Sequence, residues 1–161
     1  MAALVHLGIG LATTRAAPKV HVAVLVLSAY ALDFIWHIFC FAGIEHYPSP
    51  GPWSHGLFMS FVWSAIAALL AWGMSRSVRT GALVGLVVYS HWVVDFITHP
   101  MTALIPTDPG LPLLFNGSPG VGLGLYKNIL VVYICECGAL IPGVVIYLLT
   151  LKKLKRERTT S

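Results

Sequence analysis

The chain has 161 residues, of which 57% are hydrophobic and only 10% are charged, and its mean hydropathy is +0.81. Soluble domains carry about 25% charged residues, so this composition excludes the soluble classes and predicts one integral membrane domain over residues 1–161. The net charge is +4, but the basic residues gather in short groups beside apolar segments. That pattern is typical of membrane topology and not of a nucleic-acid-binding surface.

The first apolar segment, residues 2–13, is too short to cross a bilayer, because a spanning helix needs about 20 residues. No basic side chain precedes the segment and no cleavage site of small residues is evident, which argues against a removable signal peptide. We therefore expect a short re-entrant or interfacial helix that packs against the bundle.

Four longer apolar segments follow, and each is long enough to span a hydrocarbon core. They cover residues 20–43, 56–75, 80–98 and 129–151, and a basic tail occupies residues 152–161. The predicted fold class is an all-α, polytopic membrane protein with four transmembrane helices and the short N-terminal helix.

Basic residues flank these segments in three groups, which fall on one side of the membrane if there are four spans. The positive-inside rule makes that side cytoplasmic. We predict a multi-pass protein of the cell's inner membrane with both termini in the cytoplasm and with Lys127 as the one basic residue outside. The three groups are Arg15 with Lys19, Arg76 with Arg79, and the tail residues Lys152, Lys153, Lys155, Arg156 and Arg158.

Ionisable side chains inside the apolar segments give the strongest indication of function, because such groups are costly at membrane depth. The third span carries His91, Asp95 and His99 at four-residue spacing, which places them on one helical face. Asp33 and His37 repeat that spacing in the first span. Imidazole and carboxylate together suit zinc or a similar divalent metal.

Depth in the membrane gives an independent reason to group these residues. Counting about 1.5 Å per helical residue from the cytoplasmic groups places His91 about 18 Å and Glu136 about 24 Å from the inner face. His55 and His99 lie at the outer ends of their helices, and His6 reaches the inner edge of this region if the N-terminal helix dips inward. Polar groups from four helices are therefore expected to converge in the outer half of the membrane.

We interpret the convergence as a metal centre with one or two divalent ions, zinc first and manganese second. Glu136, His99 and His55 are assigned catalytic duty as general acid, general base or activator of bound water, with ligation as the other role of Glu136. For His91 and Asp95 the alternative is a neutral histidine hydrogen-bonded to a carboxylate. The assigned metal ligands are His6, Asp33, His37, His55, His91, Asp95 and His99.

Short motifs occur in a definite order along the chain: His6-Leu7-Gly8-Ile9-Gly10, Asp33 with His37, Trp53-Ser54-His55-Gly56-Leu57, Ser90-His91 through Asp95 and His99, and Gly122-Leu123-Gly124-Leu125-Tyr126 before the span with Glu136. This order resembles the small prokaryotic membrane-bound metal-dependent hydrolases of the LexA-binding inner-membrane type. It is also similar, more loosely, to the all-helical zinc-dependent phospholipase C type. The resemblance implies a metal-dependent hydrolase without an assigned substrate. The connection 44–53 is shorter than the insertion of those hydrolases.

The predicted function is hydrolysis of an ester or phosphoester at a metal centre in the outer-leaflet half of the membrane. Depth alone suggests a lipid or lipid-linked substrate, and no nucleic-acid partner is expected. The alternative is a metal-ion carrier or sensor that uses the same His/Asp cluster. Four spans are few for a transport path, and the sequence shows no inverted repeat or broken helix pair. The sequence leaves the oligomeric state open.

Overall fold

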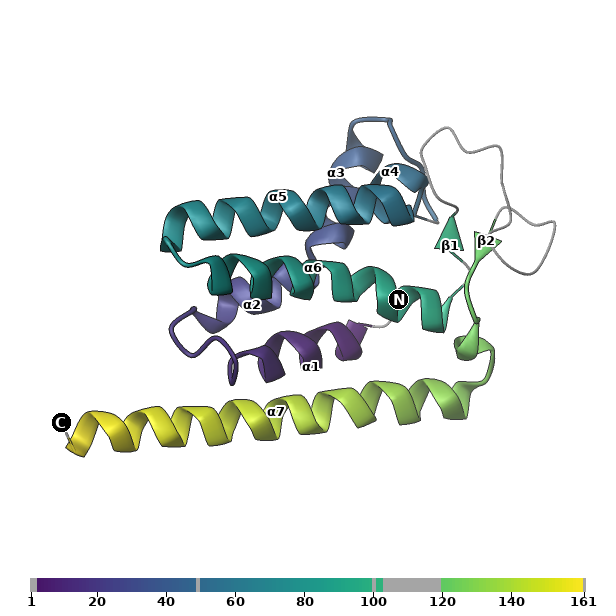
Figure 1. Ribbon diagram of the computed structural model, residues 1–161. Coiled ribbons are helices and arrows are strands. Elements are labelled where there is room, and N and C mark those ends of the chain that lie inside the picture. The colour runs from purple at the N-terminus through teal and green to yellow at the C-terminus, as the bar shows by residue number, and fades with distance from the viewer. Residues whose placement is uncertain (1–2, 49, 100, 103–119, 161) are drawn as a thin grey trace.

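A computed structural model describes residues 3–48, 50–99, 101–102 and 120–160. Its regular structure is helical apart from a pair of two-residue antiparallel strands, so the all-helical prediction is confirmed (Figure 1). The elements are α1 Ala3–Thr13, α2 Val22–Ala29, α3 Ala31–Phe41, α4 Pro52–His55, α5 Leu57–Ser75, α6 Val78–Thr98, β1 Met101–Thr102, β2 Gly120–Val121, the 3₁₀ turn η1 Leu125–Lys127 and α7 Ile129–Thr160.

Three of the described helices, α5, α6 and α7, are long and apolar enough to cross a membrane. The pair α2 and α3 makes a fourth candidate if its two halves count as one span, but they are bent by 57°. The bend lies at Tyr30, where φ of −103° and ψ of 8° interrupt the helix. The first predicted span, 20–43, is therefore a broken helix that begins at Val22, and the described chain has three or four candidate spans.

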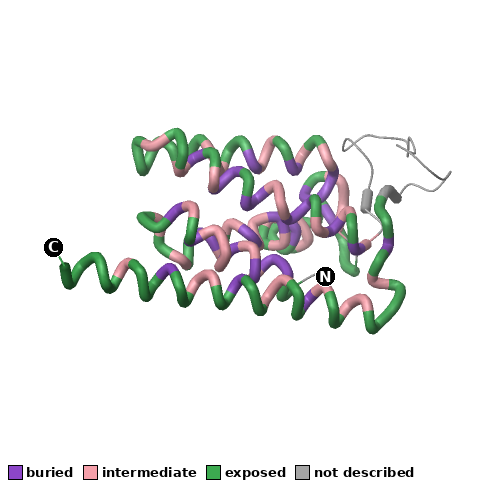
Figure 2. The backbone as a smooth tube through the Cα atoms, turned by 60° about the horizontal axis from the view of Figure 1, so that its bottom comes forward, coloured by how far each residue is buried: buried purple, intermediate pink, exposed green. Residues whose placement is uncertain are grey.

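Helix α6 is the central element of the bundle. Of its most apolar 18-residue stretch 44% is buried, against 11% for both α5 and α7. Figure 2 shows the buried residues concentrated in the interior, while much of α7 is exposed. Helix α5 packs antiparallel on α6 through glycine: a Cβ atom at Gly85 would lie 2.9 Å from the carbonyl oxygen of Ser64. Small residues of this kind let membrane helices approach closely.

Helix α1 is held between α7 and α2 by glycines on both sides. A Cβ atom at Gly8 would lie 2.4 Å from the carbonyl oxygen of Ala139, and one at Gly10 would lie 2.9 Å from the Cα of Val26. This close packing leaves no room for side chains at those positions. It carries His6 into the interior, where only 1% of the residue is exposed.

The basic groups share one end of the bundle. The α1–α2 loop, the α5–α6 turn and the C-terminal end of α7 all lie at the left of Figure 1. The basic tail is not a separate segment, because α7 continues as helix through Thr160. This common end is the arrangement that the predicted topology requires.

Candidate metal centre

Four elements bring five of the predicted ligands to one point in the interior. The side chains come from α1, α3, α4 and α6, and the three histidines among them are each 1% exposed. Two groups of three residues place one potential ligand atom each within 4.8 Å of the others, and His91 belongs to both. The groups are His6, His91 and Asp95, and Asp33, His55 and His91.

The separations of the two imidazole nitrogens from each other and from the carboxylate oxygens match the edges of a tetrahedral metal site. The Nε2 atoms of His55 and His91 are 3.3 Å apart, and Oδ1 of Asp33 lies 3.6 Å from each. Oδ2 of Asp95 lies 3.3 Å from the His91 Nε2 and 3.7 Å from the His55 Nε2. A tetrahedron with metal–ligand bonds of 2.0–2.2 Å has edges of about 3.3–3.6 Å. An octahedral magnesium site has shorter edges, about 2.8–3.0 Å.

The tautomer of His91 is fixed by the broken helix. Nδ1 of His91 lies 2.7 Å from the carbonyl oxygen of Ala29, and a carbonyl only accepts, so Nδ1 carries the proton. Ala29 is the last residue of α2, where carbonyls lack a partner within their own helix. The break at Tyr30 thus provides the acceptor that leaves the Nε2 lone pair of His91 directed at the cluster.

The tautomer of His55 is fixed by Glu45 through Ser54. Oε2 of Glu45 accepts the hydroxyl of Ser54 at 2.6 Å, and Oε1 accepts the Ser54 backbone N–H at 2.8 Å. Because the only hydroxyl proton goes to the carboxylate, Nδ1 of His55, 2.8 Å from Oγ, donates to Ser54. Nε2 of His55 then also presents a lone pair.

Two imidazole nitrogens and two carboxylates therefore face the same buried region. All four groups can donate an electron pair, and the charge of the buried carboxylates must be compensated either by protons on the imidazoles or by a metal ion that replaces those protons. Hydrogen bonds from Nδ1 to a carbonyl or to a carboxylate relay are the outer contacts that metal-binding histidines use. The residues present fit a divalent metal.

His6 and Asp95 form a second edge of the same cluster. Nε2 of His6 lies 3.4 Å from Oδ1 of Asp95, and the His6 ring stacks on His91 at 3.8 Å. Within the described part of the chain, Nδ1 of His6 and Oδ1 of Asp95 are buried without a hydrogen-bond partner. One imidazole nitrogen binds one ion, so a second ion would use His6 and Asp95 and not the shared His91.

His99 lies at the edge of the cluster. Its Nδ1 is 3.8 Å from Oδ1 of Asp95 and 2.7 Å from Oγ1 of Thr98, and 29% of its side chain is exposed. Its ring packs edge-on against Tyr126. Burial lowers the pKa of His99 below its ordinary value, which favours the neutral imidazole at neutral pH.

His37 does not join the converging ligands. It is exposed, and its Nδ1 lies 2.7 Å from the backbone oxygen of Asp33 in its own helix. Because α3 departs at 57° from α2, the next turn of helix carries His37 about 5 Å further along α3. The repeated four-residue spacing therefore brings Asp33 to the cluster and leaves His37 beside Tyr47.

Glu136 has partners of its own. Its Oε2 accepts the backbone N–H groups of Leu4 and Val5 at 2.7 and 2.9 Å, and its Oε1 accepts the hydroxyl of Tyr126 at 3.0 Å. The first N–H groups of a helix lack intrahelical partners, so Glu136 caps α1 from α7. Burial and the Glu136 carboxylate raise the pKa of Tyr126, which keeps its hydroxyl proton in this bond.

Glu45 and Ser54 contact the site but were not predicted from the sequence. Ser54 lies before the second span, whose helix α5 is capped by Gly56, and its hydroxyl binds Glu45. The available indication was a single acid in the proline-rich connection before Ser54-His55. Glu45 is 4% exposed, and burial of a lone acid cannot be read from a loop sequence.

Comparisons with known proteins found no relative of this chain. No family model, no curated protein and no solved structure matches the chain. The resemblance to membrane-bound hydrolases therefore rests on the order of the short motifs alone.

Proposed function

We propose that the chain is a membrane metalloprotein that holds zinc at this cluster and hydrolyses an ester or phosphoester of a lipid or lipid-linked substrate. The observation that carries the proposal is the convergence of the His55 and His91 Nε2 atoms with Asp33 and Asp95 at 3.3–3.7 Å. Because each Nδ1 donates to a partner outside the cluster, each Nε2 is directed at the cluster before any ion binds.

In this proposal His55, His91, Asp33 and Asp95 provide the ligands of one ion, and His6 with Asp95 accommodates a second. Bound zinc lowers the pKa of coordinated water to about 7, which provides a nucleophile at neutral pH. His99 is the partly exposed group next to the ligands, so it is our choice for the general acid or base. Glu136, which we assigned as a base from the sequence, is given a positioning role by its bonds to α1.

Support for an apolar substrate comes from the surroundings of the cluster. Its ligands lie on helices whose outer faces carry exposed large apolar side chains, such as Phe34 and Ile38 on α3 and Leu86 on α6. A substrate with acyl or isoprenoid chains can approach such a bundle from the bilayer. We place the protein in the inner membrane with the basic end cytoplasmic, by the positive-inside rule.

A metal-ion carrier or sensor is the second candidate, and one observation favours it. Transporters often place broken helices at their ion sites, and the α2–α3 pair is broken next to the cluster. The freed carbonyl of Ala29 bonds to Nδ1 of His91, however, so it orients a ligand and does not itself face the ion. This use of the carbonyl favours the enzyme.

The decisive experiment measures metal content by elemental mass spectrometry on detergent-purified protein. Wild type is expected to carry one or two zinc ions per chain, and His91→Ala and Asp95→Ala are expected to lose zinc. His37→Ala is the matched control, because it removes an imidazole from the neighbouring helix without touching the cluster, and it should retain the metal.

A folded wild-type protein without metal, or variants of His91 and Asp95 that keep their zinc, would overturn the metal centre. Product release from lipid extracts by the zinc-loaded protein, abolished by chelation, supports the hydrolase. Zinc flux into proteoliposomes without such release would instead establish the carrier.

A further inference from the structure

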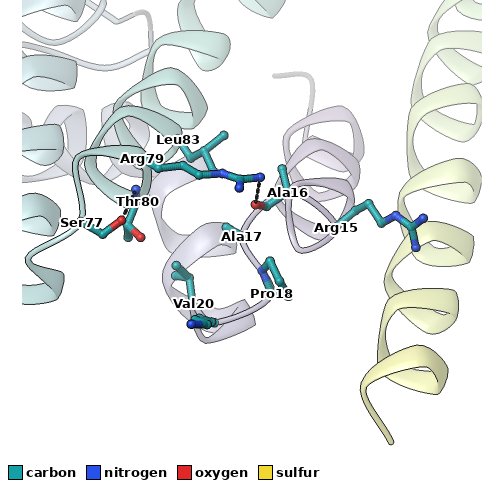
Figure 3. A pocket seen from close by; sticks show the side chains of 10 residues that line it. Arg15, Ala16, Ala17, Pro18, Val20, Ser77, Arg79, Thr80 and Leu83 are labelled. Atoms are coloured by element: carbon teal, nitrogen blue, oxygen red, sulfur yellow. Dashed lines mark hydrogen bonds between the residues drawn. The ribbon is translucent and has the colours of Figure 1, made fainter. Parts of the chain in front are cut away.

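A pocket of about 320 Å³ lies at the basic end of the bundle, between the α1–α2 loop and the start of α6 (Figure 3). At about 30 Å³ per water molecule, this volume holds roughly ten waters, which is enough for a phosphate with part of its substituent. The pocket is built from residues that take no part in the metal centre.

The lining of this pocket is strongly basic. It includes Arg15, Lys19 and Arg79 and contains no acidic residue. Among the described residues, no carboxylate forms an ion pair with Arg15, Lys19 or Arg79. The side chain of Arg15 extends toward α7 (Figure 3), so Lys19 and Arg79 are the cations available to an anion bound in the pocket.

The hydrogen-bond donors of the pocket suit a phosphate. Nη2 of Arg79 donates to the carbonyl oxygen of Ala16 at 3.2 Å and so holds the guanidinium across the pocket (Figure 3). One bond leaves four further N–H donors on this group, which pairs well with phosphate oxygens. Oγ of Ser77 accepts the backbone N–H of Thr80. Among the described residues, neither the hydroxyl proton of Ser77 nor that of Thr80 has an acceptor, so both can donate to an anion.

The location of the pocket points to a lipid as the source of the phosphate. Helix α5 ends at Ser75 and α6 begins at Val78, so the pocket lies where two candidate spans reach the membrane surface. Exposed apolar side chains stand at the same turn, with Met74 at 87% and Val78 at 71% exposure. The N-terminal end of a 21-residue helix adds a partial positive charge.

From these observations we propose that the pocket formed by Lys19, Arg79, Ser77 and Thr80 binds the phosphate of an anionic phospholipid head group. The site anchors the α1–α2 loop and the start of α6 to the lipid surface. It is independent of the proposed metal chemistry.

The test measures binding of short-chain phosphatidylglycerol to the full chain in neutral detergent, by the shift in its unfolding temperature. Phosphatidylcholine and inorganic phosphate are the two comparison probes. We expect Arg79→Gln to weaken binding of phosphatidylglycerol at least tenfold, and Lys19→Gln, at an exposed position, to weaken it less. Arg76→Gln is the matched control, because it removes the same charge from the same turn but does not line the pocket, and it should change binding less than threefold.

Equal losses in Arg79→Gln and Arg76→Gln would mean general attraction to negative charge and would overturn the site. So would equal binding of phosphatidylcholine, or inorganic phosphate that stabilises the protein as strongly as the lipid at equal concentration. If Arg79→Gln does not fold, Lys19→Gln and Arg76→Gln give the same comparison.

Discussion

At the scale of single residues, the site is defined by what holds each imidazole in place. Nδ1 carries a proton in both His91 and His55, and each donates it to a different acceptor. His91 donates to a carbonyl freed by a helix break, and His55 donates to a serine hydroxyl that binds Glu45. Partners of this kind raise ligand basicity and fix ring orientation. They also explain why two buried residues outside the ligand set, Glu45 and Ser54, belong to the centre.

The contribution of this relay can be measured directly. Glu45→Gln and Ser54→Ala should each lower zinc affinity about 10–100-fold, because His55 loses the acceptor that fixes its tautomer. Competition with a chelator gives the affinity, and nitrogen chemical shifts of His55 report the tautomer. Ser64→Ala is the control, since that buried hydroxyl bonds only within α5. Unchanged zinc affinity in both relay variants would assign Glu45 to loop structure alone.

At the scale of elements, the short helix α1 and the broken pair of α2 and α3 shape the centre. Helix α1 enters the bundle because glycines of α1 and α7 meet: a Cβ at Gly143 would lie 2.4 Å from the carbonyl oxygen of Gly8. Glu136 caps its first turn. The α2–α3 break provides the Ala29 carbonyl and brings Asp33 to the first turn of α3. The local irregularities of the fold therefore position its ligands.

Helix α7 offers a matched pair of glycines for testing this packing. Gly143→Ala should destabilise the protein by about 1–3 kcal/mol, because the added methyl group overlaps the backbone of α1. Gly138→Ala meets nothing within 4 Å and should be neutral or slightly stabilising, since alanine is the better helix former. Unfolding in detergent and hydrogen exchange over residues 3–13 measure both effects. Equal stability of the two variants would contradict close α1–α7 packing.

At the scale of the whole molecule, the basic groups occupy one end and the apolar helices run from it. This polarity predicts a defined orientation in the membrane. In a variant without Cys40, Cys135 and Cys137, a cysteine at Lys127 should react with a membrane-impermeant maleimide in intact cells. A cysteine at Thr159 should react only after the membrane is opened. The reverse pattern would invert the topology and place the phosphate pocket outside.

Much of this organisation could be predicted from the sequence. Runs of apolar residues determine where helices form, and the positions of Arg and Lys determine that their basic ends coincide. The i, i+4 rule correctly places His91 and Asp95 on one face of α6, because residues four positions apart in a continuous helix always lie on the same face. The same rule was insufficient for Asp33 and His37, because α3 leaves α2 at 57° and only its first turn lies at the cluster.

What only the tertiary structure decided are the contacts between elements. The sequence by itself determined the membrane class, the helices and the set of candidate ligands, since hydrophobicity and helical periodicity are local properties. The break at Tyr30, the burial of Glu45 and the capping of α1 by Glu136 depend on which carbonyls, hydroxyls and N–H groups meet across the bundle. Those meetings join residues up to 132 positions apart, and no local pattern encodes them.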